Sequence, residues 1–173
     1  MAKSILTAFF TILIALSLFS CAGGPPPGPS SPDDCLVVIK TDFILGKGVD
    51  ATHQSARQYA LELSGGYGHI SMQSGYSTAV VHEPAVRVTA ITSVLPGNYI
   101  GGASNDPIKG NVILPYKPGS FVVADFVFVK RIEKDQTREN SLIDYQGFRL
   151  ITESERAEHI ERLKADLASG TWQ

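Results

Sequence analysis

The residues best suited to acid–base or metal chemistry are four histidines, spread along a chain of 173 residues. An imidazole can bind a metal or transfer a proton near neutral pH, but none of the four has a partner at metal-ligand spacing. His82-Glu83-Pro84 lacks the second histidine and the helix that the zinc-protease motif requires. His159 falls among glutamates on a predicted helix, where a solvated position is expected. With no G-x-S-x-G motif either, the sequence predicts no enzyme, no metal site and no cofactor.

Asp125 is the most informative carboxylate, because it lies between Ala124 and Phe126 in a strongly apolar run. An ionised group in such surroundings costs free energy unless it is paired. One interpretation makes Asp125 a ligand contact or a base with a raised pKa. The favoured interpretation is structural: the carboxylate pairs with a lysine or arginine of a neighbouring strand, or lies at an edge or bulge.

Four tyrosines lie near predicted turns: Tyr67, Tyr76, Tyr99 and Tyr116. Aromatic rings at loop tips can form a platform for a sugar or a peptide, because each ring has an apolar face and a polar hydroxyl. The favoured alternative places these rings at the rim of a core. With Asp125, these tyrosines are the candidate binding residues.

The N-terminal residues have the layout of an export signal. Lys3 precedes an uncharged stretch from Ile5 to Phe19, and the small Ser20 precedes Cys21. Leu18-Phe19-Ser20-Cys21 resembles the lipobox of bacterial lipoproteins, in which the cysteine thiol receives a diacylglycerol. The resemblance implies that residues 1–20 are removed and that acylated Cys21 anchors the protein in a bilayer. The alternative, an uncleaved anchor helix, is a little short of the roughly 20 residues that a span needs.

In Gram-negative lipoproteins, an aspartate after the lipidated cysteine favours the inner membrane, so Ala22 favours the outer membrane, on a side that the sequence leaves open. Residues 21–34 are expected to form a Pro/Gly-rich linker, which the resemblance implies is lipidated at its start, and 13 of them (22–34) would reach roughly 40 Å when extended. Cys35 then follows in an apolar run. It is either the partner in an intermolecular disulfide or, as favoured, a small buried hydrophobic residue.

The rest of the chain is mainly β in pattern, with strands expected at 35–45, 57–63, 69–72, 76–81, 86–91, 111–114, 120–132 and 142–151. Residues 101–110 are polar and predict an exposed loop. The run 120–132 is apolar on both faces, so we expect it to be covered on both sides or to meet a C-terminal helix. Acidic and basic residues are interspersed along the chain and the net charge is −2, so nothing in the sequence suggests the basic face that a nucleic-acid partner would require.

A helix is predicted after residue 151. Thr152-Glu153-Ser154-Glu155 is a capping box, Gly170 is a plausible stop, and Trp172 is expected to pack on the sheet. An apolar stripe follows the capping box at helical spacing, at Ala157, Ile160, Leu163 and Leu167.

About seven to eight strands and one terminal helix predict a single β-sandwich domain over residues 35–173. Two strand starts share a pattern, Pro96-Gly97-Asn98-Tyr99-Ile100 and Pro118-Gly119-Ser120-Phe121-Val122. This pattern, with the final helix and tryptophan, resembles the prealbumin-like and DUF2846-like β-sandwich domains of bacterial lipoproteins over residues 57–173. The resemblance implies a fold and a location but no reaction.

Together these features predict a membrane-anchored envelope lipoprotein with a non-enzymatic structural or protein-interaction role. Its expected partners are the bilayer and an envelope protein or glycan. The alternative is a glycan- or peptide-binding module that uses the loop tyrosines or a free sheet edge.

Overall fold

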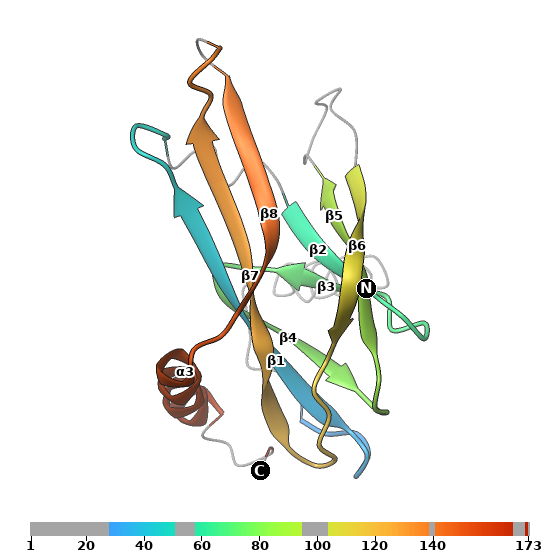
Figure 1. The fold of residues 1–173 in the computed structure, drawn as a ribbon. Helices are drawn as coiled ribbons and strands as arrows, with labels where there is room; N and C mark the ends of the chain where they lie inside the picture. Colours follow the sequence, from blue (N-terminus) through green and yellow to red (C-terminus); the bar gives the residue numbers. More distant parts are fainter. Residues whose placement is uncertain (1–27, 51–57, 95–103, 139–140, 168–171, 173) are drawn as a thin grey trace, which may run out of the picture.

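The computed structural model describes residues 28–50, 58–94, 104–138, 141–167 and 172, and in these ranges the chain forms a β-sandwich with one C-terminal helix, as predicted (Figure 1). The strands and the helix are β1 (Cys35–Leu45), β2 (Gln58–Leu63), β3 (His69–Met72), β4 (Gly75–Val81), β5 (Arg87–Val94), β6 (Ser104–Ile113), β7 (Phe121–Lys134), β8 (Leu142–Leu150) and α3 (Glu153–Asp166). No helix in the described ranges combines the length and apolarity that crossing a bilayer requires.

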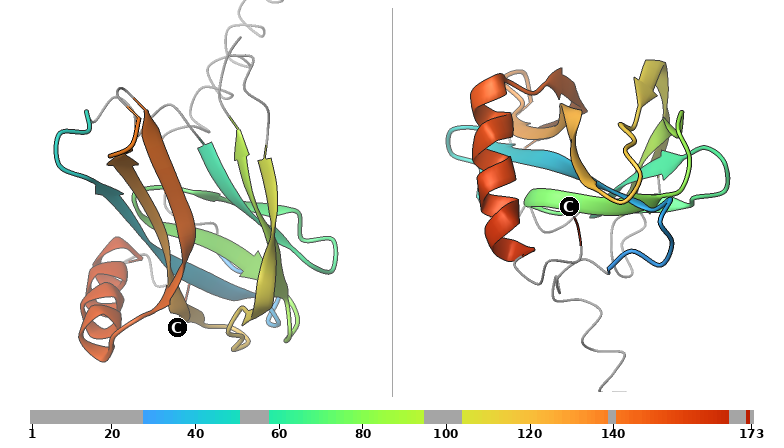
Figure 2. Two further views of the ribbon diagram at one scale, coloured as in Figure 1. Left: turned by 45° about the horizontal axis from the view of Figure 1, so that its top comes forward. Right: turned by 90° about the horizontal axis from the view of Figure 1, so that it is seen from below.

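The strands form two four-stranded sheets (Figures 1 and 2). One, called here the β1 sheet, has the order β4-β1-β7-β8, and the other, the β2 sheet, has the order β3-β2-β5-β6. Only β1 and β7 pair in parallel, and the other described pairs are antiparallel. Because β3 and β4 belong to different sheets, the chain crosses from one sheet to the other between Met72 and Gly75.

The main core lies between the two sheets. Alternation along β2 places Tyr59 and Leu61 on the inner face, and both are buried. Opposite them, Ala124, Phe126 and Phe128 of β7 face inward. Fully burying one such large apolar side chain contributes roughly 1.5–3 kcal/mol, so this layer is a large part of what holds the sheets together.

A second core lies between the β1 sheet and α3, which packs on the sheet face opposite the β2 sheet (Figure 2). Val123 and Val127 of β7 face the helix, while Ala124 and Phe126 between them face the main core. The double apolar pattern of this strand is therefore explained by two cores. Trp172 is also buried in the second core, which confirms its predicted packing.

The capping box of α3 is present. The Thr152 hydroxyl accepts a hydrogen bond from Glu155 N at 3.3 Å, and Thr152 N donates to Glu155 Oε2 at 3.0 Å. The predicted apolar stripe is wrong at one position, since Ala157 is exposed. His159 is buried instead, which corrects its predicted solvated position, because positions 159, 163 and 167 lie one turn apart on the face that packs on the sheet.

The predicted loop at 101–110 is wrong from residue 104 onward, because Ser104–Ile113 form β6. The segment contains Asp106, Pro107 and Gly110, which are all poor strand formers. It forms a strand because its backbone pairs with β5 on one side, with a shift of register between Val88 and Ala90. An edge strand tolerates proline, since one side of its backbone needs no partner.

Candidate functional site

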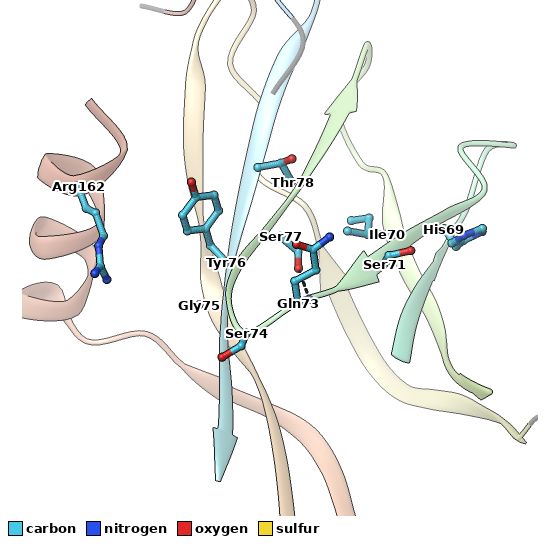
Figure 3. A pocket seen from close by; sticks show the side chains of 10 residues that line it. All are labelled: His69, Ile70, Ser71, Gln73, Ser74, Gly75, Tyr76, Ser77, Thr78 and Arg162. Atoms are coloured by element: carbon cyan, nitrogen blue, oxygen red, sulfur yellow. Dashed lines mark hydrogen bonds between the residues drawn. The ribbon is translucent and has the colours of Figure 1, made fainter. Parts of the chain in front are cut away.

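A polar hollow with a volume of about 580 Å³ lies where β3, β4 and α3 come together (Figure 3). Small-molecule and cofactor sites typically occupy about 300–1,000 Å³, so the volume suits a ligand. We call this feature the edge hollow. Its lining consists of His69, Ile70, Ser71, Gln73, Ser74, Gly75, Tyr76, Ser77, Thr78 and Arg162.

The edge hollow forms because two outer strands meet at a sharp corner. β3 pairs only with β2 and β4 only with β1 in the described part of the chain, so each has one free edge there. Gly75 has a φ of 95°, a left-handed conformation that favours glycine. Gln73 N donates a 2.8 Å hydrogen bond to Ser77 Oγ, which holds the corner closed (Figure 3).

The lining is rich in hydroxyl groups and carries positive charge without a carboxylate. Ser71, Ser74 and Thr78 supply hydroxyls, and Gln73 supplies an amide. Arg162 is exposed and forms no ion pair with any residue that the structure describes. The arrangement offers hydrogen bonds and one guanidinium to a ligand, and no group poised for covalent chemistry.

The strand edges on the opposite side of the sandwich are protected against pairing. β6 carries Pro107, which has no N–H to donate, and the side chain of Gln146 in β8 donates to the carboxylate of Asp106 in β6 across the two sheets. Charged side chains and proline are the usual means by which edge strands avoid pairing with other chains. β4, by contrast, has seven residues with no proline and no charge.

A separate polar cluster lies beyond the other end of β4, about 20 Å along the strand from Tyr76 at 3.3 Å per residue. His82 Nδ1 is 2.7 Å from Oδ1 of the buried Asp34, whose Oδ2 accepts from Ser30 N at 2.6 Å and Ser31 N at 3.1 Å. Burial acts to raise the pKa of Asp34, but the hydrogen bonds from Ser30, His82 and Ser31 outweigh it and lower the pKa. Asp34 is therefore held as a carboxylate, and its hydrogen bond to Nδ1 orients the imidazole of His82.

Two predicted tyrosines belong to this second cluster. Tyr67 OH accepts from His82 N at 3.2 Å, and Tyr116 OH lies 3.1 Å from His82 O and 2.9 Å from Asp33 O. The nearby Cys35 is not a competent nucleophile, because it is buried and burial raises the pKa of its thiol. Its Sγ accepts a hydrogen bond from Lys117 N at 3.3 Å. The cluster thus has an oriented histidine without an activated nucleophile beside it.

An ionic network joins α3 to the β1 sheet. Glu155 lies 2.8 Å from Lys40 Nζ and 2.6 Å from Arg149 Nη2, and both cations also contact Asp42, at 2.9 and 2.5 Å. Hydrogen bonds from Arg149 and Lys40 lower the pKa of Glu155 strongly. Because each charge in the network has partners within it, the network fixes the helix and leaves no charge for a ligand.

Lys130 is buried on the inner face of β7, where its Nζ lies 4.2 Å from the ring centroid of Tyr59. The Tyr59 hydroxyl in turn donates to the carboxylate of Asp144. A desolvated cation over an aromatic face is a favourable contact, so this cluster is accounted for by packing of the core.

The structure does not bring the predicted site residues together. Tyr76 lines the edge hollow, Tyr67 and Tyr116 lie around His82, and Cys21 and Tyr99 lie outside the described residues. Asp125 lies at the bulge between β1 and β7, where its largely exposed carboxylate is 2.6 Å from Arg156 Nη2. The cation comes from the helix and not from a neighbouring strand.

Sequence reasoning missed Ser71, Ser74, Thr78 and Arg162. Each is an ordinary surface residue type, and only the fold places β3, β4 and α3 side by side. The one usable signal was the uncharged, proline-free run Gly75–Val81. Cysteine, histidine and carboxylate side chains do not gather into groups of three that could hold a metal within the described ranges.

No protein-family model, no curated protein and no solved structure matches the chain. A functional role of the edge hollow is therefore supported by its geometry and its lining residues alone.

Proposed function

We propose that this chain is a lipid-anchored protein of the bacterial cell envelope with a non-enzymatic, protein-binding role. In this proposal acylated Cys21 holds the protein in a membrane, preferentially the outer membrane, and residues 22–34 tether the folded domain. The domain binds an extended segment of a partner protein along the free edge of β4, inside the edge hollow. The observation that carries the binding role is the unprotected edge of β4.

An exposed strand edge presents a row of backbone N–H and C=O groups, which an extended peptide can satisfy by adding a strand to the sheet. The contrast between the two sides of the sandwich supports this mode. Proline and a bond between the sheets protect β6 and β8, whereas β4 has neither proline nor charge. Serine and threonine around β4 offer further hydrogen bonds to a polar partner.

A glycan is the second candidate ligand, because the lining combines hydroxyl, amide and guanidinium groups with the aromatic ring of Tyr76. A glycan would use these side chains and would not form a backbone ladder with β4. The two ligands are therefore distinguished by contacts between backbones, seen as cross-strand nuclear Overhauser effects between a bound peptide and residues 75–81.

The lipid anchor is tested by mass spectrometry of the native protein, which should show an acylated N-terminal Cys21. A product that retains Met1 would contradict this part of the proposal. The binding role is tested with Ser71→Trp, which fills the edge hollow from β3. The matched control is Thr89→Trp, at another exposed position of the same sheet outside the lining. Loss of peptide binding in the first variant alone is expected, and equal binding by both would refute the site.

A further inference from the structure

We infer that the edge hollow selects an extended segment with a carboxylate at one position, which pairs with Arg162. This inference rests on the proposed function and adds to it the chemical class of the partner.

Arg162 is placed for this role by the second core. Leu163, its neighbour in α3, is buried against the β1 sheet, and this contact holds the helix beside the first residues of β4. Figure 3 shows Arg162 on the helix, across from Tyr76. An extended chain that pairs with β4 would pass beside both residues.

The charge around Arg162 leaves it available to a ligand. On its own helix, Glu161 pairs with Lys164 at 2.9 Å, and Glu158 lies beyond ion-pair distance of Arg162 in the structure. The lining contributes no carboxylate, and its other ionisable groups are His69 and the hydroxyl of Tyr76. Arg149 and Arg156, by comparison, each have a carboxylate within 2.6 Å.

Strand alternation specifies the pattern of the partner. Tyr76 and Val80 of β4 face the helix side, whereas Ala79 and Val81 face the main core. Side chains of an added strand would alternate in the same way. The acidic residue is thus expected on the helix side, and its neighbours on the other side are expected to be small or apolar. A guanidinium binds a carboxylate through two parallel hydrogen bonds, so lysine would replace Arg162 poorly.

The test uses a display library of randomised peptides, selected against the full-length chain in detergent and against its Arg162→Gln variant. We expect the wild-type chain to enrich peptides with aspartate or glutamate at one fixed position, flanked by small or apolar residues. Replacing that acid with asparagine or glutamine in a synthetic copy should weaken binding about 3- to 10-fold, because the pair is partly exposed to solvent. The same replacement should have no effect with Arg162→Gln, and Arg87→Gln is the control for loss of an exposed arginine.

The outcomes separate this inference from the proposed function. Selected peptides that contact β4 without any acidic preference would overturn the inference and leave the binding role in place. A selection that yields no peptide, or binding of an anionic oligosaccharide without backbone contacts to β4, would overturn both. Copies of a selected peptide with free and amidated C-termini show whether the carboxylate belongs to a side chain or to the chain end.

Discussion

Removing the side chain of Leu163 should detach the helix that supplies Arg162. Leu163 is 1% exposed and lies in the second core with Val123, Val127 and Trp172. Leu163→Ala deletes three carbon atoms from this layer. Because the layer has a sheet on one side and a single helix on the other, it cannot close the resulting space completely.

The loss of unfolding free energy in Leu163→Ala has two parts: the lost burial of apolar carbons and the cavity that remains. Three buried carbons at roughly 0.8 kcal/mol each amount to about 2.4 kcal/mol, and the residual cavity adds to this within the range of about 2–5 kcal/mol seen for buried leucines. We expect a loss of about 3 kcal/mol. For a domain of this size, that corresponds to a fall in Tm of about 6–12 °C. Ala157→Gly, at an exposed position of the same helix, should cost only about 1 kcal/mol through helix propensity.

The single tryptophan of the chain makes the assay specific, because Trp172 lies in the same core. Urea unfolding is followed by the fluorescence of Trp172 and by the circular dichroism of the sheets. Leu163→Ala should shift the fluorescence transition to lower urea by at least as much as the dichroism transition. If Leu163→Ala cost no more than Ala157→Gly, the second core would not be what holds α3 in place.

Three further predictions concern stability and reactivity. The pKa values of Asp42 and Glu155 are lowered in the folded state, so the unfolded chain binds protons first as the pH falls. Their stabilisation is full above the ordinary carboxyl pKa of about 4 and declines below it. Chemical unfolding between about pH 3 and 6 should show this slope, and Asp42→Asn should flatten it. Thr152→Ala should cost about 1 kcal/mol through loss of the helix cap, measured as the free energy of unfolding, whereas Ser154→Ala should cost less. Cys35 should resist iodoacetamide in the folded protein and react in urea, because it is fully buried and its thiol has a raised pKa; rapid labelling without denaturant would contradict its placement.

The sequence pattern predicted an element correctly where local preference for that element and burial in the fold favour the same residues. The bounds of Cys35–Leu45 and His69–Met72 match the predicted strands, and the capping box at Thr152 starts the helix. In the two strands the apolar residues that favour the element locally are also those that the packing buries, and the capping box depends only on contacts within four consecutive residues. The same agreement let the sequence predict both apolar faces of β7.

The predictions from sequence pattern were wrong where contacts with distant parts of the chain determine the secondary structure or the burial of a residue. Residues 104–110 have poor strand propensity, yet β5 supplies them with a backbone partner. His159 lies in a charged sequence but is buried, and that burial lowers its pKa. The edge hollow depends on which strands end at the sheet edges, and spacing along the chain does not encode that order.

The free edge of β4 could pair with unintended chains, and the elements around it limit which chains can reach it. An unprotected strand edge can pair with any exposed extended chain, so proteins normally block it. Here the approach is bordered by α3 on one side and by the β3 corner on the other, where the Gln73–Ser77 hydrogen bond holds the turn. In the proposed binding mode, we expect a single extended strand to enter between these borders and a broad sheet edge of another molecule to be kept out by them. The features that would restrict indiscriminate pairing are therefore the same ones that, in this proposal, select a single extended segment as the partner.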